Sequence, residues 1–289
     1  MSNSAEENMS AIKIGVIGGS GVYKIEGIEV VREHTVSTPF GNPSSEIIEA
    51  KLNGVTFFFL PRHGKHHSFT PSDVNYRANI FALKELGVEY LISVSAVGSL
   101  KEEYPPTTFV VVDQFIDWTK GKRERTFFNN GFVGHTSVAE PVEKELQQMI
   151  VDACKEVGVK HGVGGSYICI EGPQFSSKAE SNIYRSFGAS VIGMTNVPEA
   201  YLAKEAGMAY ASIAMVTDYD CWKEEHCTLE EIMKVMATNN QQAHAVLKKL
   251  IPKLNGNLFS FKKENTYSVL SKPEKMTADQ ERMLSVLMR

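Results

Sequence analysis

The chain has 289 residues and carries a formal net charge of −4, with 43% apolar residues. This apolar share is enough to bury a core and excludes a chain that is disordered throughout. Acidic residues outnumber basic ones, 34 against 30, which argues against a dedicated nucleic-acid-binding protein. No run of about 18 apolar residues is present, so no membrane-spanning helix is predicted.

Residues 1–10 are polar and acidic and lack the apolar segment of a secretory signal, so they are predicted to form a flexible tail. The four cysteines include no C-x-x-C pair and are too few to form a disulfide framework in a chain of this length. Both features indicate a soluble intracellular protein with free thiols.

Short apolar segments of strand length alternate with amphipathic segments along the chain. Strands are predicted at Ala11–Ile17, Val55–Leu60, Tyr90–Val94, Phe109–Asp113, Ser166–Ile170, Val191–Met194 and Tyr210–Val216. Helices are predicted at Pro71–Leu86, Val142–Val157, Ser177–Phe187, Pro198–Ala206, Thr228–Ile251 and Ala278–Leu287. We expect the long helix to end before Pro252, residues 253–275 to be irregular, and Thr277 with Gln280 to form a capping box. The alternation, without a linker or an internal repeat, predicts a single α/β domain over residues 11–289, with a central mixed sheet flanked by helices.

Polar or glycine-rich residues follow three of the predicted strands. A Gly-Gly-Ser-Gly turn containing Ser20 follows the first strand and matches neither a P-loop nor a dinucleotide fingerprint. Arg62 and His63 follow the second strand, and Ser95 and Ala96 end the third. These residue types suit an anion, because α/β sheets bind ligands at the carboxyl ends of their strands. Ordinary turns, a solvated basic loop and a metal site on the histidines remain as alternatives.

Two carboxylates, Asp218 and Asp220, follow the most apolar strand two positions apart. Side chains at this spacing can point at one ligand and act as a general acid or accept a hydrogen bond from an amine. An aspartate after a strand is also an ordinary turn residue, so this pair alone leaves both interpretations open.

Six motifs occur in order: Gly-Gly-Ser-Gly, Pro-Arg-His-Gly, Ser-Ala-Val-Gly-Ser, Glu-Gly-Pro-Gln-Phe-Ser-Ser-Lys-Ala-Glu, Gly-Met-Thr-Asn-Val-Pro-Glu and Thr-Asp-Tyr-Asp-Cys-Trp. Together they resemble the trimeric purine nucleoside phosphorylase family, and within it the enzymes that cleave methylthioadenosine. The resemblance covers about residues 11–250 and is weaker toward the end of the chain.

The resemblance implies the nucleoside phosphorylase fold and the phosphorolysis of methylthioadenosine to adenine and 5-methylthioribose 1-phosphate, in purine and methionine salvage. It implies inorganic phosphate as the second substrate, no metal and no organic cofactor. It also implies a homotrimer with active sites near subunit interfaces, no nucleic-acid or membrane partner, and a cytoplasmic location with the nucleus as a second compartment.

The resemblance also assigns residues. Phosphate is expected at Ser20, Arg62, His63, Ser95, Ala96 (through its backbone) and Thr195. Met194 is expected under the ribose and Phe175 against the purine. Leu229 and Ile232 are expected to line the alkylthio pocket, completed by His135 and Leu287 of a neighbouring subunit.

Asp218 is the expected acid at N7 of the purine, and Asp220 is expected to accept from the 6-amino group or to orient Asp218. Members that act on 6-oxopurine nucleosides carry Glu and Asn where this chain has Ser176 and Asp218. A carboxylate suits adenine, so the alternative of a 6-oxopurine (inosine or guanosine) phosphorylase is disfavoured. A binding module without catalysis and a nucleoside hydrolase are further alternatives.

Overall fold

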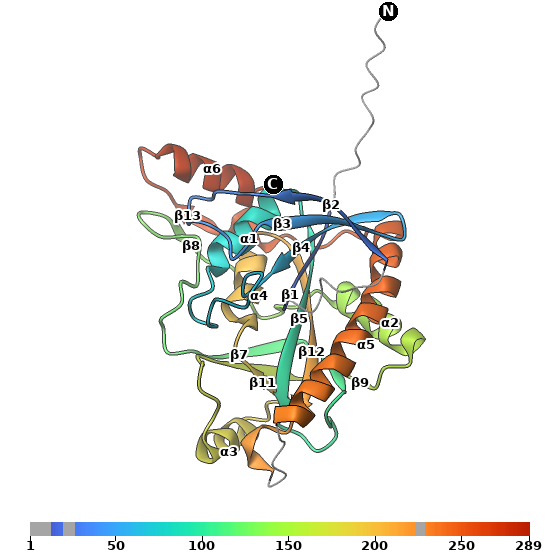
Figure 1. Cartoon of the computed structure of the whole chain (residues 1–289). Helices are drawn as coiled ribbons and strands as arrows, with labels where there is room; N and C mark the ends of the chain where they lie inside the picture. The colour runs from blue at the N-terminus through green and yellow to red at the C-terminus, as the bar shows by residue number, and fades with distance from the viewer. Residues whose placement is uncertain (1–12, 20–26, 224–228) are drawn as a thin grey trace, which may run out of the picture.

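A branched sheet of eleven strands forms the centre of the described part of the chain (Figure 1). The computed structural model describes residues 13–19, 27–223 and 229–289, and the side chains of Leu229, Thr266 and Tyr267 are also outside the description. The tail predicted at residues 1–10 therefore lies outside the described residues. The main path of the sheet runs β2-β3-β4-β1-β5-β11-β10-β7, and β12, β6 and β9 join it through β5.

The strands are β1 Ile14–Gly18, β2 Ile28–His34, β3 Ile47–Leu52, β4 Val55–Pro61, β5 Tyr90–Ser99, β6 Phe109–Val111, β7 Gln114–Trp118, β8 Val133–Gly134, β9 His161–Val163, β10 Ser166–Ile170, β11 Val191–Gly193, β12 Ala209–Asp218 and β13 Val269–Ser271. The helices are α1 Tyr76–Glu85, α2 Lys144–Val157, α3 Lys178–Ser186, α4 Asn196–Glu205, α5 Leu229–Gly256 and α6 Ala278–Leu287, with 3-10 turns η2 Asp220–Trp222 and η3 Glu264–Tyr267. β8 and β13 form a separate two-stranded sheet.

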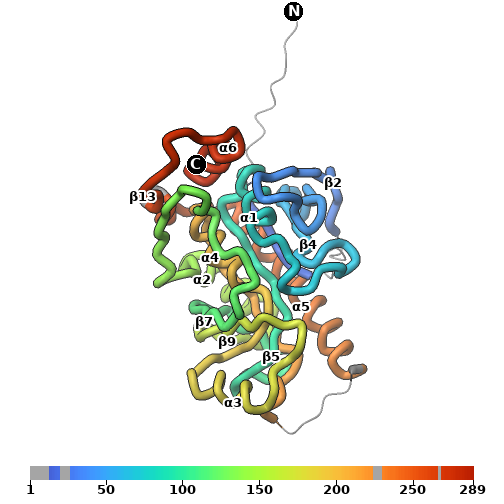
Figure 2. Tube along the Cα trace, turned by 90° about the vertical axis from the view of Figure 1, so that its left-hand side faces the viewer, coloured from blue at the N-terminus to red at the C-terminus, as the bar shows by residue number. Residues whose placement is uncertain are grey.

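The helices cover both sides of the sheet. α2 packs on α5 on one side, whereas α1 contacts α4 on the other side and also α6 (Figure 1). α6 and β13 lie at one end of the molecule and α3 at the opposite end, as both views show (Figure 2). This arrangement confirms the predicted α/β architecture with a mixed sheet flanked by helices.

β5 is paired differently along its two edges. One edge pairs with β12 from Tyr90 to Gly98. The other edge pairs with β1 only as far as Ser93, and with β11 only from Gly98 onward. No strand in the described residues covers positions 94–97 on that second edge. The backbone at these positions is therefore open to other partners, in the middle of the sheet.

Two helices have bounds that differ clearly from the prediction. α1 begins at Tyr76 and not at Pro71, because the side chain of Asn75 caps the helix by accepting from the Ala78 amide at 3.1 Å. α5 continues through Pro252 to Gly256, because Leu250, Ile251 and Leu254 of its last turns are fully buried in the core. That burial offsets the backbone hydrogen bond that proline cannot make.

Several strands have no counterpart in the prediction, namely β2, β3, β7, β8, β9 and β13. β2 is an exposed edge strand and carries charged residues. β8, β9 and β13 have only two or three residues each, which is too short for a periodic pattern. The capping boxes that open α3 and α6 are both present, and the predicted Ala278–Leu287 helix is confirmed.

Two expectations about the class of protein can be checked within the described residues. None of the helices there is long and apolar enough to cross a membrane. The three cysteines there, Cys154, Cys169 and Cys221, are free thiols.

Leu247 of α5 is fully buried in the core, and Lys249 of the same helix is exposed. We expect Leu247→Ala to lower the free energy of unfolding by about 2–5 kcal/mol, because it removes buried methyl groups and leaves a cavity. Lys249→Ala is the matched control and is expected to change it by less than about 0.5 kcal/mol. Urea unfolding of the two variants checks this. Equal destabilisation would contradict the packing described for α5.

Candidate functional site

A cavity of about 890 Å³ opens between the ends of the central strands and helix α5. Its volume lies in the range of small-molecule sites. It gathers most of the residues that the sequence predicts for the site. These are Arg62, His63, Ser95, Ala96, Phe175, Ser176, Met194, Thr195, Asp218, Asp220 and Ile232.

Four predicted residues are not among those that line the cavity. Ser20 and the side chain of Leu229 lie outside the described residues. His135 is exposed and donates its backbone amide to the Ser268 carbonyl. Leu287 is completely buried in this chain's own core, on α6. A side chain with no exposed surface cannot contact a neighbouring subunit, so this position of Leu287 conflicts with the predicted contact.

The open edge of β5 forms the wall of the cavity that suits an anion. Ser95 comes from this edge, and its hydroxyl lies 3.2 Å from that of Thr195, at the start of α4. The Tyr167 hydroxyl lies 3.4 Å from both Ser95 Oγ and the Thr195 amide. The Tyr167 hydroxyl fits here only because residue 193 is glycine. A Cβ atom at position 193 would lie 2.0 Å from the Tyr167 hydroxyl oxygen. Two hydroxyls and an exposed Ala96 thus converge on one part of the cavity.

Arg62 reaches the same part of the cavity but is 2% exposed and strongly paired. Its Nε donates to Glu199 Oε2 at 2.6 Å and its Nη2 to Glu199 Oε1 at 3.0 Å. Burial alone would lower the pKa of Arg62, but the charge and hydrogen bonds of Glu199 more than compensate and raise it. The guanidinium is therefore a fixed cation whose charge is balanced by a buried carboxylate.

His63 is 9% exposed, and its Nδ1 lies 3.0 Å from the carbonyl oxygen of Phe69. A carbonyl only accepts, so Nδ1 carries the hydrogen. Burial, together with the charge of Arg62, lowers the pKa of His63 to about 4, while the Phe69 contact opposes the shift. The neighbouring ring of His67 stacks on it at 4.4 Å between centroids. The ring is therefore neutral near pH 7 in the absence of an anion.

Met194 lines the cavity next to Thr195 and packs against the loop that follows β10. Gly172 of that loop has φ +67°, and a Cβ there would lie 2.5 Å from the Met194 sulfur. Both the backbone conformation and the space therefore require glycine at this position. A thioether here offers a soft apolar surface to a ligand.

The two carboxylates form a compact turn at the end of β12. The Asp220 amide donates to Asp218 Oδ1 at 2.7 Å, and the Thr217 hydroxyl lies 2.7 Å from Asp218 Oδ2. Asp220 has φ +53°, which is unusual for a residue with a side chain. Burial raises the pKa of Asp220, and the charge of Asp218 raises it further. Asp220 therefore takes up a proton more readily than an exposed aspartate would.

Trp222, two residues after Asp220, holds this turn in place. Trp222 Nε1 donates to the Ser99 carbonyl at 2.7 Å, and the guanidinium of Arg185 lies 3.8 Å from the centre of the Trp222 ring. Both contacts fix the chain directly after Asp220, so the orientation of the carboxylates is set before a ligand arrives.

Phe175 and Ser176 line the cavity from the loop before α3. The Phe175 side chain is 85% exposed at the edge of the cavity, so one face of the ring is open to a planar ligand. The hydroxyl oxygen of Ser176 is buried and makes no hydrogen bond to any described residue. An unpaired hydroxyl next to an aromatic ring suits a heterocyclic base.

Helix α5 closes the cavity with Ile232, Met233 and Met236. Met233 is 58% exposed although it lines the cavity. These flexible apolar side chains can follow the shape of an apolar ligand group.

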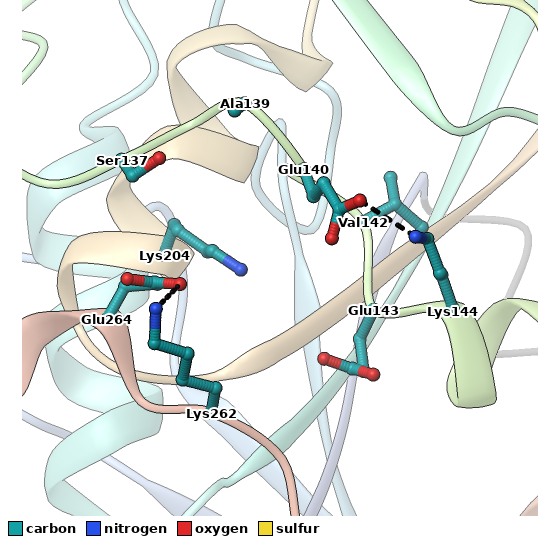
Figure 3. A pocket seen from close by; sticks show the side chains of 9 residues that line it. All are labelled: Ser137, Ala139, Glu140, Val142, Glu143, Lys144, Lys204, Lys262 and Glu264. Atoms are coloured by element: carbon teal, nitrogen blue, oxygen red, sulfur yellow. Dashed lines mark hydrogen bonds and ion pairs between the residues drawn. The ribbon is translucent and has the colours of Figure 1, made fainter.

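A second hollow of about 300 Å³ lies elsewhere and is lined mainly by charged side chains (Figure 3). Lys144 pairs with Glu140 at 2.7 Å, and Lys262 pairs with Glu264 at 2.9 Å. It contains none of the residues predicted for the site, and its lysines are balanced by carboxylates. The larger cavity is therefore the candidate site.

The sequence interpretation missed two buried charges beside the cavity. No function is assigned to Glu199 from the sequence, although it stands in the same motif as Met194 and Thr195. A single acidic residue at the start of an otherwise apolar helix could have indicated a buried carboxylate. Arg123, from the loop after β7, donates to the Val197 carbonyl at 2.7 Å and to the Glu171 carbonyl at 2.9 Å. It joins this loop to the start of α4 and to the segment that follows β10, and nothing in its local sequence indicated these contacts.

Residues 13–252 match the family model described as the phosphorylase superfamily. The chain is 51% identical to S-methyl-5′-thioadenosine phosphorylase of Rhodospirillum rubrum over 243 residues, which cover 83% of this chain and 82% of that protein. It is 52% identical to the protein of the same name from Pyrococcus abyssi, covering 84% and 93%. The fold is similar to that of a methylthioadenosine phosphorylase from an antarctic soil metagenomic library, with a TM-score of 0.90, 41% identity and coverage of 96% and 99%. Methylthioadenosine phosphorylase from Schistosoma mansoni in complex with adenine gives a TM-score of 0.80 at 37% identity, covering 85% and 92%.

The state of the His63 ring can be tested by NMR titration of protein labelled with ¹⁵N-histidine. We expect His63 to stay neutral, with the hydrogen on Nδ1, until the pH falls to about 4. Added inorganic phosphate should move its titration to higher pH, because a nearby anion favours the charged ring. His63→Asn assigns the signal. A midpoint near 6.5 without phosphate would contradict the burial of the ring.

Proposed function

The chain belongs to the phosphorylase superfamily, and on this basis we propose that it catalyses the phosphorolysis of S-methyl-5′-thioadenosine to adenine and 5-methylthioribose 1-phosphate. The observation that carries the proposal is one cavity that combines fixed anion donors with a carboxylate pair and an exposed aromatic ring. The relatives that bear this name share about half of their residues with the chain. The activity would serve purine and methionine salvage.

In this proposal, phosphate binds along the open edge of β5. Ser95 and Thr195 supply hydroxyl donors, Ala96 its backbone amide, and Arg62 a guanidinium hydrogen. His63 faces the anion from the turn after β4, and Ser20 belongs to the proposed set although it lies outside the described residues. Most of these donors are neutral groups in a desolvated site, where each hydrogen bond to an anion is strong.

The reaction exchanges one bond at C1′ of the ribose. A phosphate oxygen forms a bond to C1′ as the bond from C1′ to N9 breaks, and the electron pair of that bond goes to the purine. Asp218 transfers a proton to N7, so adenine leaves as a neutral molecule. Asp220 accepts from the 6-amino group or orients Asp218. The raised pKa of Asp220 favours a protonated carboxyl group beside Asp218.

The remaining contacts orient the nucleoside. Met194 packs under the ribose, and Phe175 covers the purine. The buried, unpaired hydroxyl of Ser176 faces the base in this pose. A glutamate at this position would suit a 6-oxopurine, so Ser176 together with Asp218 supports adenine over hypoxanthine or guanine.

At the 5′ end, Ile232 with Leu229 would contact the methylthio group. We include a homotrimer in the proposal, as the family resemblance implies. His135 is exposed and does not line this chain's cavity, so in this proposal it contributes to the cavity of another copy. Leu287 is left out of this contact because it is buried in its own core. A cytoplasmic location, with the nucleus as a second one, remains part of the proposal.

Adenine release from methylthioadenosine tests the reaction type directly. We expect release only in the presence of inorganic phosphate, with equimolar 5-methylthioribose 1-phosphate as the second product. Inosine should react less efficiently by a factor on the order of 10⁴, because it leaves a buried polar group unpaired. Release without phosphate would indicate a hydrolase, and preference for inosine would indicate a 6-oxopurine phosphorylase.

Asp218→Asn tests the acid. We expect kcat/KM for methylthioadenosine to fall by about 10²- to 10⁴-fold, because the amide cannot give a proton to N7. Binding of phosphate, measured by calorimetry, should stay unchanged. Asp113→Asn is the matched control, since Asp113 is an exposed acid whose Oδ1 accepts from the Gly165 amide away from the cavity. An unaltered kcat/KM in Asp218→Asn would exclude this acid.

A further inference from the structure

We propose that Glu199 is a positioning residue for phosphate, which fixes the Arg62 guanidinium so that one Nη1 hydrogen points into the cavity. The inference rests on the proposed function and names a residue that touches neither substrate. Glu199 is completely buried and is not among the residues that line the cavity.

The hydrogen bonds of Arg62 leave little freedom for its side chain. Nε is used by Glu199, and Nη2 has three acceptors: Ser93 Oγ at 2.7 Å, Glu199 Oε1 at 3.0 Å and the Ile17 carbonyl at 3.4 Å. Nη1 donates one hydrogen to the Val94 carbonyl at 3.1 Å. Among the described residues, its second hydrogen meets no acceptor. Arg62 lines the cavity, so this remaining hydrogen is the one that a bound anion can accept.

A carboxylate at position 199 is needed for this arrangement. Oε2 accepts from Arg62 Nε, and Oε1 accepts from Arg62 Nη2, from Ser93 Oγ at 2.8 Å and from the Tyr210 hydroxyl at 3.0 Å. Each of these four hydrogen bonds is donated to Glu199, so a side chain that also donates cannot satisfy the same set. The fork of the guanidinium matches the two oxygens, which fixes its plane as well as its position.

Glu199 also connects Arg62 to a second phosphate donor. It lies in the first turn of α4, which begins directly after Thr195. In the same turn, Asn196 Nδ2 donates to the Tyr210 hydroxyl at 2.6 Å and to Ser212 Oγ at 2.8 Å. Arg62 directly after β4, Ser95 of β5 and Thr195 directly before α4 are thus connected by one buried network. A shift of Glu199 would move Arg62 and Thr195 relative to each other.

If the ion pair of Arg62 and Glu199 were purely structural, breaking it would lower the stability of the protein. It would not change the KM for phosphate relative to the KM for methylthioadenosine. A positioning pair makes a different prediction, because only the phosphate contacts depend on it. Interactions that orient a reactant are sensitive to displacements on the order of 1 Å, so a loss of register should raise the KM for phosphate and lower kcat.

The test is Glu199→Gln, with Glu205→Gln as the matched control. Glu205 is at the other end of α4 and accepts from Thr126 Oγ1 and from the Phe127 amide, without lining the cavity. We expect Glu199→Gln to raise the Kd of inorganic phosphate and its KM by about 10- to 100-fold, because an amide hydrogen then opposes an Arg62 hydrogen. The KM for methylthioadenosine should change less than about threefold, and Glu205→Gln should leave both constants unchanged.

The calorimetric Kd separates this proposal from the proposed function, because it needs no turnover. If the wild-type protein binds phosphate but does not release adenine, the function is wrong and the positioning of Arg62 can still be tested. If Glu199→Gln does not fold, Ser93→Ala takes its place, with a smaller expected rise in the phosphate Kd of about 3- to 10-fold. A lower melting temperature with an unchanged phosphate Kd, in whichever of the two variants folds, would overturn the proposal.

Discussion

The pairing of β5 is the constraint on which the site depends. β12 occupies one edge of β5 from Tyr90 to Gly98, whereas β1 and β11 divide the other edge. On that second edge, no strand of the described residues pairs with positions 94–97. Backbone groups in the middle of a sheet need partners. Here the Arg62 guanidinium provides one for Val94. Positions 94–97 of β5, which lack a described strand partner on this edge, line one wall of the cavity.

A cation in this opening has an electrostatic cost, which the protein offsets with Glu199. Desolvation of an isolated guanidinium would be strongly unfavourable, and a bidentate carboxylate with well-aligned hydrogen bonds reduces that penalty. The result is a cavity wall with a balanced charge. The net charge of −4 therefore does not conflict with the proposed binding of a small dianion. In that proposal the anion contacts hydroxyls, backbone amides and one oriented guanidinium hydrogen, and it does not depend on a general excess of positive charge.

Much of the candidate site could be predicted from the sequence, because its residues follow strands whose apolar patterns are clear. Ser95, Asp218 and Asp220 follow buried runs, and the topology brings these strand ends to one cavity. The missed parts have physical reasons. β2 and β3 pair with each other, β3 pairs with β4, and β2 lies at an exposed edge, so sheet pairing stabilises segments with weak patterns. α1 begins later than predicted because Asn75 caps it, whereas the Ser72 side chain donates to Glu171, which is 99 residues away.

The sequence by itself determined the α/β architecture, the buried strands and the residue types of the site, because periodicity and strand-end chemistry are local properties. Only the tertiary structure decided the partners. It paired Arg62 with Glu199, 137 residues away, made His63 neutral by burying its ring, and placed Leu287 in the core. Each of these outcomes depends on desolvation and on contacts between distant segments. Net charge and local sequence carry no information about either.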